Sequence, residues 1–196
     1  MNIGLDIDNV ITEFDKTLLS AMLKEDKNKR NNGIINPKAK HISNGMFDWT
    51  QDEVEEFYKN NMQSLAKIHL PKPNCKFYID KLINDGHKII LITNRTTKHY
   101  QNPEIVTIDW LKNNNINYHK LVFSKTPDKS DECFENSIDI MIDDRAEQCK
   151  LMRDKGVHVI VMLTDYNSPY IGNLPFVKDW KELYEVISNF KNKSMR

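Results

Sequence analysis

The stretch that decides the fold is residues 1–10, MNIGLDIDNV, where a short apolar run leads directly into two carboxylates. Asn2–Leu5 is expected to form a strand, and Asp6 and Asp8 follow it. Side chains two residues apart in an extended chain point to the same side. Both carboxylates can therefore face one ligand just beyond the strand, although a solvated turn would have the same residues.

Four later runs predict the other strands of a parallel sheet. Continuous apolar stretches such as IILI and VIVM are typical of strands buried on both faces. Helical patterns alternate with them at 75–84, 103–113, 146–155 and 180–190. This alternation predicts an α/β fold, a Rossmann-like doubly wound parallel sheet that binds ligands beyond the carboxyl ends of its strands. The four runs are Lys88–Thr93, Leu121–Phe123, Ile138–Ile142 and His158–Met162.

A long block between the first strand and the helix at Cys75 interrupts the alternation. Residues 12–23 have a helical pattern, residues 25–32 (EDKNKRNN) are expected to be flexible, and Thr50 with Glu53 predicts a capping box that opens another helix. We expect a small helical cap at 15–74, inserted after the first strand, and a core at 1–14 and 75–196. The alternative is a disordered excursion with one surface helix, and the fold of residues 25–45 stays open.

Composition limits the classes of function. The chain has 196 residues, enough for one α/β domain with a modest insertion. Its 28 basic and 28 acidic residues balance, which disfavours polymeric nucleic acid as a partner but permits a small anionic substrate. Apolar runs stay below the ~18 residues that cross a bilayer, and residues 1–8 are too acidic for a signal peptide. We therefore expect no membrane association.

The cysteines indicate a reducing compartment. Cys75, Cys133 and Cys149 are odd in number and widely spaced, without the spacing of a zinc site or a disulfide framework. Free cysteine is among the most buried residue types. We expect three buried thiols in a cytoplasmic protein.

Two further strand ends carry groups that suit a phosphate and a cation. Thr93 and Asn94 end the second strand, where a hydroxyl and successive backbone amides can hold a phosphate. Asp143 and Asp144 end the fourth, where adjacent carboxylates are costly to bury without a cation. Taken singly, a hydroxyl-capped turn and an acidic helix N-terminus explain them equally well. Taken together with Asp6, they lie at the edge of the sheet where such folds bind ligands.

In combination these features resemble the haloacid dehalogenase superfamily of phosphohydrolases. That superfamily has an apolar strand ending in Asp-x-Asp, a strand ending in Thr or Ser, a lysine, and a strand ending in an acidic pair. Asp-Asp-Arg at 143–145, and Phe14 eight residues after Asp6, resemble the 5'(3')-deoxyribonucleotidases of cytosolic type C and their bacterial relatives. The resemblance covers Met1 to about Leu163. The motifs match, in order, Asp6–Val10, Thr93, Lys129 and Asp143–Glu147.

The resemblance implies a role for each motif. Asp6 would attack phosphorus and form an aspartyl-phosphate, while Asp8 would act as the general acid and base. Mg²⁺ would be held by Asp6, the backbone carbonyl of Asp8 and Asp144, with Asp143 as a second or water-mediated ligand. The remaining groups would hold the phosphate: Thr93, Asn94 and Lys129.

Four other side chains have open roles. Lys125 competes with Lys129 for the lysine motif, and we prefer Lys129 because it precedes the helix that leads to Ile138. Arg95 could reach a phosphate or a base, or form a surface ion pair. Phe14 is expected at the start of the first cap helix, facing the site, where it would stack on a base or pack within the cap. Arg145 is expected to pair with an acid of its own loop.

The substrate is the least readable feature. We expect a small phosphorylated metabolite, with nucleoside monophosphates first and sugar phosphates as the alternative. Dehalogenases lack the second acid of the first motif, and phosphonatases need a cap lysine for which Lys67 is unconvincing. A phospho-accepting receiver domain is the alternative of another class, but receivers have a different motif order and no long insertion. The oligomeric state stays open, with a homodimer among the alternatives.

Overall fold

The computed structural model describes residues 1–194. In this part of the chain six strands form one sheet in the order β3-β2-β1-β4-β5-β6, and every pairing is parallel. The strands are β1 (Asn2–Leu5), β2 (Lys88–Thr93), β3 (Lys120–Phe123), β4 (Ile140–Asp143), β5 (Val159–Met162) and β6 (Phe176–Val177). The helices are α1 (Phe14–Lys29), α2 (Gln51–Ile68), α3 (Cys75–Asn84), α4 (Pro103–Asn113), α5 (Ser130–Glu135), α6 (Ala146–Asp154), the 3-10 turn η1 (Ser168–Tyr170) and α7 (Trp180–Ser194).

Different helices cover the two faces of the sheet. Ile89 and Leu91 of β2 belong to a hydrophobic cluster with residues of α3, α4 and α7. Ile90 and Ile92 point to the opposite face and belong to a cluster with residues of α5 and α6. The sheet is therefore doubly wound, and the predicted α/β Rossmann-like fold is confirmed.

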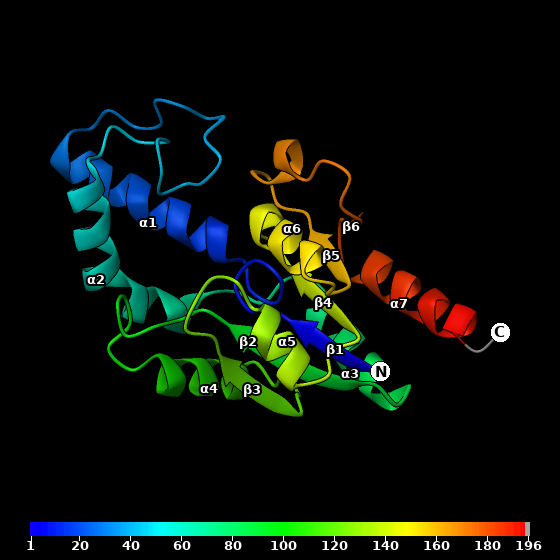
Figure 1. The fold of residues 1–196 in the computed structure, drawn as a ribbon. Coiled ribbons are helices and arrows are strands. Elements are labelled where there is room, and N and C mark those ends of the chain that lie inside the picture. Colours follow the sequence, from blue (N-terminus) through cyan, green and yellow to red (C-terminus); the bar gives the residue numbers. More distant parts are fainter. Residues whose placement is uncertain (195–196) are drawn as a thin grey trace.

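A separate hydrophobic cluster lies in the block between β1 and α3. Helices α1 and α2 supply Leu18, Met22 and Phe57, and the segment between the helices supplies Met46 and Phe47. Figure 1 shows both helices together beyond the end of β1, at the edge where the parallel strands finish. The segment thus forms its own small core over the strand ends, while the domain boundaries at residues 15 and 74 stay a prediction.

Two adjacent stretches of chain, residues 11–13 and 70–72, connect this segment to the sheet. Thr12 and Pro71 form an isolated antiparallel bridge. Beside it, the Glu13 amide donates to the Leu70 carbonyl and the Lys72 amide to the Ile11 carbonyl, each at 2.7 Å. Two buried tryptophans hold the backbone next to this connection. Trp110 Nε1 donates to the His69 carbonyl (2.8 Å), and Trp180 Nε1 donates to the Val10 carbonyl (2.9 Å).

The structure corrects the predicted flexible stretch at 25–32. Helix α1 continues to Lys29 through most of it. The reason is Asp26, which is 1% exposed and accepts hydrogen bonds from Trp49 Nε1 (2.9 Å) and the Gly33 amide (2.7 Å). One carboxylate therefore anchors both the end of α1 and the loop that follows.

Other differences are small. The fourth strand begins at Ile140 rather than Ile138, and the sheet has an additional edge strand, β6. The three cysteines are buried free thiols, as expected. Among the described residues, every helix is too short or too polar to cross a membrane.

Candidate active site

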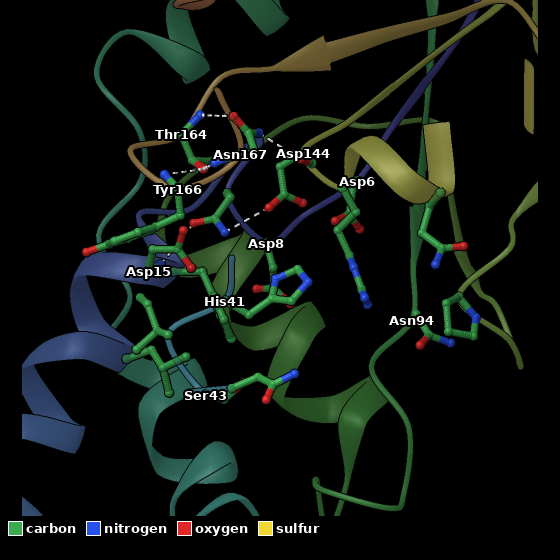
Figure 2. Close-up of a pocket in the computed structure, with 18 of the residues that line it drawn as sticks. Asp6, Asp8, Asp15, His41, Ser43, Asn94, Asp144, Thr164, Tyr166 and Asn167 are labelled. Atoms are coloured by element: carbon green, nitrogen blue, oxygen red, sulfur yellow. Dashed lines mark hydrogen bonds between the residues drawn. The ribbon is translucent and has the colours of Figure 1, made fainter. Parts of the chain in front are cut away.

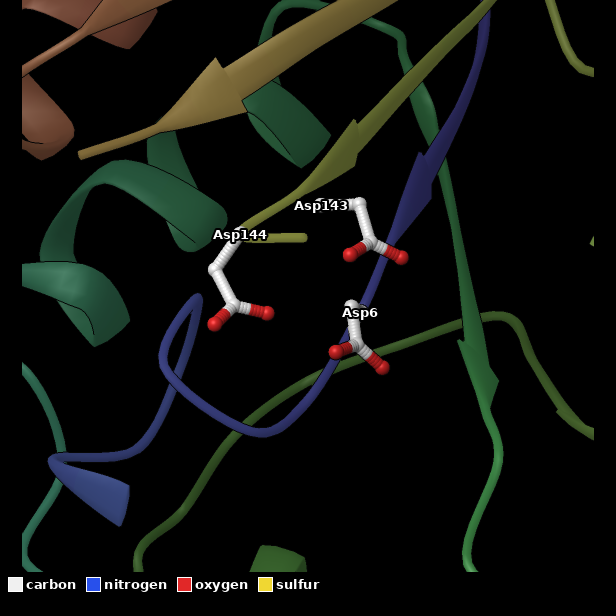
Figure 3. A group of neighbouring side chains, drawn as sticks. All are labelled: Asp6, Asp143 and Asp144. Atoms are coloured by element: carbon white, nitrogen blue, oxygen red, sulfur yellow. The ribbon is translucent and has the colours of Figure 1, made fainter. Parts of the chain in front are cut away.

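Three carboxylates converge at the carboxyl edge of the sheet. Asp6 follows β1, Asp143 is the last residue of β4, and Asp144 comes next, so the pairing of β1 with β4 brings them together. One oxygen from each lies within 4.8 Å of the others. Figure 3 shows the three side chains grouped at this edge. Asp6 and Asp143 are buried. Hard carboxylate oxygens in this number are the donor set that Mg²⁺ takes, so the residues present fit a divalent cation.

A buried lysine joins two of these carboxylates. Lys129 precedes α5, and its Nζ lies 2.7 Å from Asp6 Oδ1 and 2.7 Å from Asp143 Oδ2. Lys125, the other candidate from the sequence, is exposed and forms no ion pair with the side chains described in residues 1–190. The structure therefore places Lys129 among the acids, and Lys125 in solvent.

The cluster carries more negative charge than Lys129 can neutralise. Burial raises the pKa of Asp6 to about 7, with the charges of Asp143 and Asp8 adding to the effect and that of Lys129 opposing it. Burial and the neighbouring charges of Asp143 and Asp6 likewise raise the pKa of Asp144. Burial disfavours the charged form of Lys129, but Asp143 and Asp6 outweigh it and raise its pKa. A further positive charge at this point would relieve the repulsion.

The end of β2 offers hydrogen-bond donors beside the carboxylates. Thr93 is 1% exposed, and its Oγ1 has no hydrogen-bond partner among the described residues. Buried hydroxyls are normally paired, so an unpaired one at the wall of a cavity suits an anionic ligand. Asn94 comes next, and its side-chain amide donates to the Ser124 carbonyl (3.0 Å), which fixes the turn. Both predicted phosphate-binding residues thus line the same cavity as Asp6.

Asp8 forms an ion pair with the buried Arg95 that the sequence does not predict. Arg95 Nε donates to Asp8 Oδ2 at 3.0 Å, and Nη2 donates to Asp8 Oδ1 at 2.6 Å. Burial alone would raise the pKa of Asp8, but the Arg95 guanidinium outweighs it and holds that pKa below its usual range. Arg95 is therefore buried and paired, and its ion pair is with the partly exposed Asp8 rather than with a surface acid. Spacing along the chain carries no signal for this contact, because it joins residues 87 positions apart.

The carboxylates open into a cavity of about 470 Å³ between the sheet edge and the α1–α2 segment. Phe14 is the first residue of α1 and lines it, as expected, with its ring 5.3 Å from that of His69. Figure 2 shows that His41 and Ser43, from the loop between α1 and α2, lie in the wall of the same cavity. The sequence did not point to these two, because the loop has no periodic pattern.

The loop after β5 completes the wall on the side of Asp144. Asn167 Nδ2 donates to the Asp144 carbonyl (2.7 Å) and to the Met162 carbonyl (2.8 Å), as Figure 2 illustrates in part. Asn9 Nδ2 donates to Asp144 Oδ2 at 3.0 Å. These two asparagines orient Asp144. The sequence does not predict this role, because a single asparagine in a loop has no distinctive pattern.

Contacts of two glutamates join the α1–α2 segment to α6 and to the loop after β2, on both sides of the cavity. Glu147 of α6 lies 3.3 Å from Lys40 Nζ and 3.2 Å from His41 Nε2. Arg145 pairs with the same glutamate at 3.2 Å, in keeping with its expected acidic partner. On the other side Glu55 of α2 contacts Lys98 Nζ (2.9 Å) and His99 Nε2 (3.1 Å).

Comparisons with known proteins identify the family of the chain. A family model described as "5' nucleotidase, deoxy (Pyrimidine), cytosolic type C protein" matches residues 1–194. A Chlorobaculum tepidum protein named "Putative 5'(3')-deoxyribonucleotidase" is 24% identical over 196 residues, covering 96% of this chain and 90% of that protein.

Solved structures share the fold at low identity. A "predicted phosphatase" from Clostridium acetobutylicum has a TM-score of 0.68 at 14% identity, covering 96% of this chain and 98% of its own. A haloacid dehalogenase family hydrolase from Deinococcus radiodurans, with bound phosphate and sodium, has a TM-score of 0.67 at 9% identity, covering 96% and 95%.

Proposed function

The chain belongs to the family of deoxy (pyrimidine) 5'-nucleotidases of cytosolic type C, and from that membership we propose that it removes the phosphate from (deoxy)nucleoside 5'-monophosphates. It is a phosphoric monoester hydrolase of the haloacid dehalogenase superfamily. The observation that carries the proposal is the cluster of Asp6, Asp143 and Asp144, which faces a cavity and in which Lys129 bridges Asp6 and Asp143.

We propose Mg²⁺ as the cofactor. Asp6, Asp143 and Asp144, with the backbone carbonyl of Asp8, would hold the ion. When bound, it would neutralise phosphoryl oxygens and the surplus charge of the carboxylates. The raised pKa values of Asp6 and Asp144 support this assignment, because burial and mutual repulsion disfavour both charges until a cation is present.

The reaction proceeds through Asp6 in two displacements. An Asp6 oxygen attacks phosphorus, and the bond from phosphorus to the ester oxygen breaks. The ester oxygen keeps the electron pair of that bond and takes up a proton from the protonated form of Asp8. Water then attacks the aspartyl-phosphate, gives a proton to Asp8, and releases phosphate and free Asp6. Thr93, Asn94 and Lys129 would hold the phosphoryl oxygens in both steps.

The cavity suits a leaving group of nucleoside size. Its volume of about 470 Å³ lies within the usual range of ligand pockets, roughly 300–1,000 Å³. Phe14 lines it and offers an aromatic face, which favours a base over a small sugar. A sugar phosphate is the second candidate, favoured by the polar groups of Ser43, Asn44 and Gln51 in the same wall. We place the reaction in the cytoplasm, on a free metabolite.

Phosphate release from a panel of monoesters tests the proposal. With Mg²⁺ we expect turnover of deoxyribonucleoside 5'-monophosphates, and Asp6→Asn should lower kcat by at least about 10³-fold, because the amide is no nucleophile. Asp154→Asn, the same change at an exposed site, should keep full activity.

Two outcomes separate the parts of this proposal. Activity on sugar phosphates or aryl phosphates alone, still lost in Asp6→Asn, would reject the nucleotide but keep the aspartyl nucleophile. Equal activity of Asp6→Asn and the unmodified protein would reject the mechanism itself.

A further inference from the structure

We propose that Arg95 is a positioning residue, which holds the carboxyl group of Asp8 in the orientation that serves both chemical steps. The proposal rests on the proposed function, in which Asp8 gives a proton to the ester oxygen and regains one from water. It replaces the substrate contact expected for Arg95 with a role exerted through Asp8.

The two side chains meet as a fork. Nε and Nη2 of Arg95 reach separate oxygens of Asp8, at 3.0 and 2.6 Å. A planar guanidinium that makes two parallel hydrogen bonds fixes the plane of the carboxylate as well as its distance. A lysine, with one ammonium group, would fix the distance alone.

Arg95 is itself held rigidly. Its Nη1 donates to Thr107 Oγ1 of α4 at 3.1 Å, and Thr107 is fully buried. The Tyr100 ring lies 5.7 Å from the guanidinium carbon, close enough for a cation–π contact. Arg95 is the second residue after the end of β2, so the sheet fixes the position of its backbone. All three parts of the guanidinium therefore have a partner.

The exposed fractions of the two side chains indicate that Asp8, and not Arg95, contacts the substrate. The Arg95 side chain is 1% exposed and the Asp8 side chain 21%. A carboxylate has about four lone-pair sites, and the fork takes one on each oxygen. Thr12 Oγ1 lies 3.5 Å from Asp8 Oδ1, so the second site on Oδ2 is the one left to face the cavity that Asp8 lines. Arg95 consequently acts on the reaction through Asp8 rather than by touching the phosphate.

A fixed orientation matters most for esters with poor leaving groups. The alkoxide of a nucleoside must receive a proton as its bond to phosphorus breaks, and a misplaced acid slows that step. The phenolate released from p-nitrophenyl phosphate is stable without a proton. Disturbing the contact between Arg95 and Asp8 should therefore slow hydrolysis of the nucleotide more than hydrolysis of the aryl ester. Losing a phosphate-binding residue would slow both alike.

The test compares kcat/KM for thymidine 5'-monophosphate and p-nitrophenyl phosphate with Mg²⁺. Arg95→Lys should lower kcat/KM about 10²-fold for the nucleotide and less than about tenfold for the aryl ester, with the loss in kcat. Thr107→Val, which removes only the anchor on Nη1, should show the same selectivity to a smaller extent. Arg153→Lys, the same change at a more exposed site, should alter neither ester.

The results that would overturn the inference are distinct from those that would overturn the proposed function. Equal losses for both esters in Arg95→Lys, or a rise in KM alone, would make Arg95 a phosphate-binding residue. If Arg95→Lys does not fold, unchanged selectivity in Thr107→Val overturns it instead. The proposed function fails if the unmodified protein hydrolyses neither ester, or if Asp6→Asn is as active as the unmodified protein.

Discussion

His69 is a buried histidine at the junction between the α1–α2 segment and the rest of the molecule. It follows α2 and is 3% exposed, and neither ring nitrogen has a hydrogen-bond partner within the described residues. Burial lowers its pKa from 6.5 to about 4, with a smaller effect of Arg95 in the same direction and an opposing one of Asp8. The side chain is therefore neutral in the folded protein at pH 7.

This burial predicts a loss of stability in mild acid. As pH falls from about 6.5 to about 4, the unfolded chain binds a proton at His69 and the folded chain does not. The free energy of unfolding should fall through that window, by up to about 3 kcal/mol. His69→Phe should remove this contribution, so that the difference between variant and unmodified protein grows as pH falls. Urea denaturation at several pH values measures it, and parallel pH profiles would contradict it.

Single residues differ in how far sequence could place them. The position of Lys129 before a helix favours it over Lys125, and its Nζ lies 2.7 Å from Asp6 and from Asp143. The partner of Asp8 was not foreseen, since Arg95 follows a different strand and its contact exists only in the folded sheet. Local pattern locates a side chain on an element, whereas side-chain partners depend on packing.

Helix α2 begins at a reciprocal cap. Thr50 Oγ1 accepts a hydrogen bond from the Glu53 amide (3.3 Å), and Glu53 Oε2 accepts one from the Thr50 amide (2.8 Å). The same glutamate pairs with Arg30 just beyond the end of α1. This cap therefore joins the start of one helix to the end of the other.

Removing the hydroxyl should weaken this element. Thr50→Ala is expected to lower the free energy of unfolding by about 1 kcal/mol, because the Glu53 amide loses its acceptor at the first turn. Thr50→Ser keeps the oxygen and should retain most of the stability. The urea midpoint should shift at constant m-value. Equal midpoints for the alanine and serine variants would show that the cap does not stabilise the protein.

Elements with a strong periodic pattern were predicted with near-correct bounds. Cys75–Asn84, Pro103–Asn113, Asn2–Leu5 and Lys88–Thr93 agree with the structure at both ends. The errors occur where a tertiary contact decides the structure: Asp26 keeps a charged stretch helical by binding Trp49, and β6 has only two residues. Such contacts leave no trace in a short window of sequence.

In the whole molecule, the carboxylates lie at the boundary between the sheet and the α1–α2 segment. The sheet supplies the carboxylates, the α1–α2 segment supplies the opposite wall, and Lys40, His41, Lys98 and His99 connect the two through glutamates. The alternation of helices and strands predicts the doubly wound parallel sheet, but not the order of its strands. The wall was not predictable either, because it is built from a loop whose shape depends on its own small core.

Excess negative charge at this boundary predicts how the whole protein responds to metal. Mg²⁺ at about 100 times its Kd should raise the free energy of unfolding by about 2.7 kcal/mol, and Tm by about 5–10 °C for a chain of this size. Asp144→Asn should lose most of this shift, because it removes a proposed ligand. Without metal it should be at least as stable as the unmodified protein, since burial and two nearby acids disfavour the charge of Asp144.

Asp154→Asn, at an exposed site, should keep the full response to Mg²⁺. Thermal melts with and without Mg²⁺ decide this, and equal shifts in both variants would place the ion elsewhere.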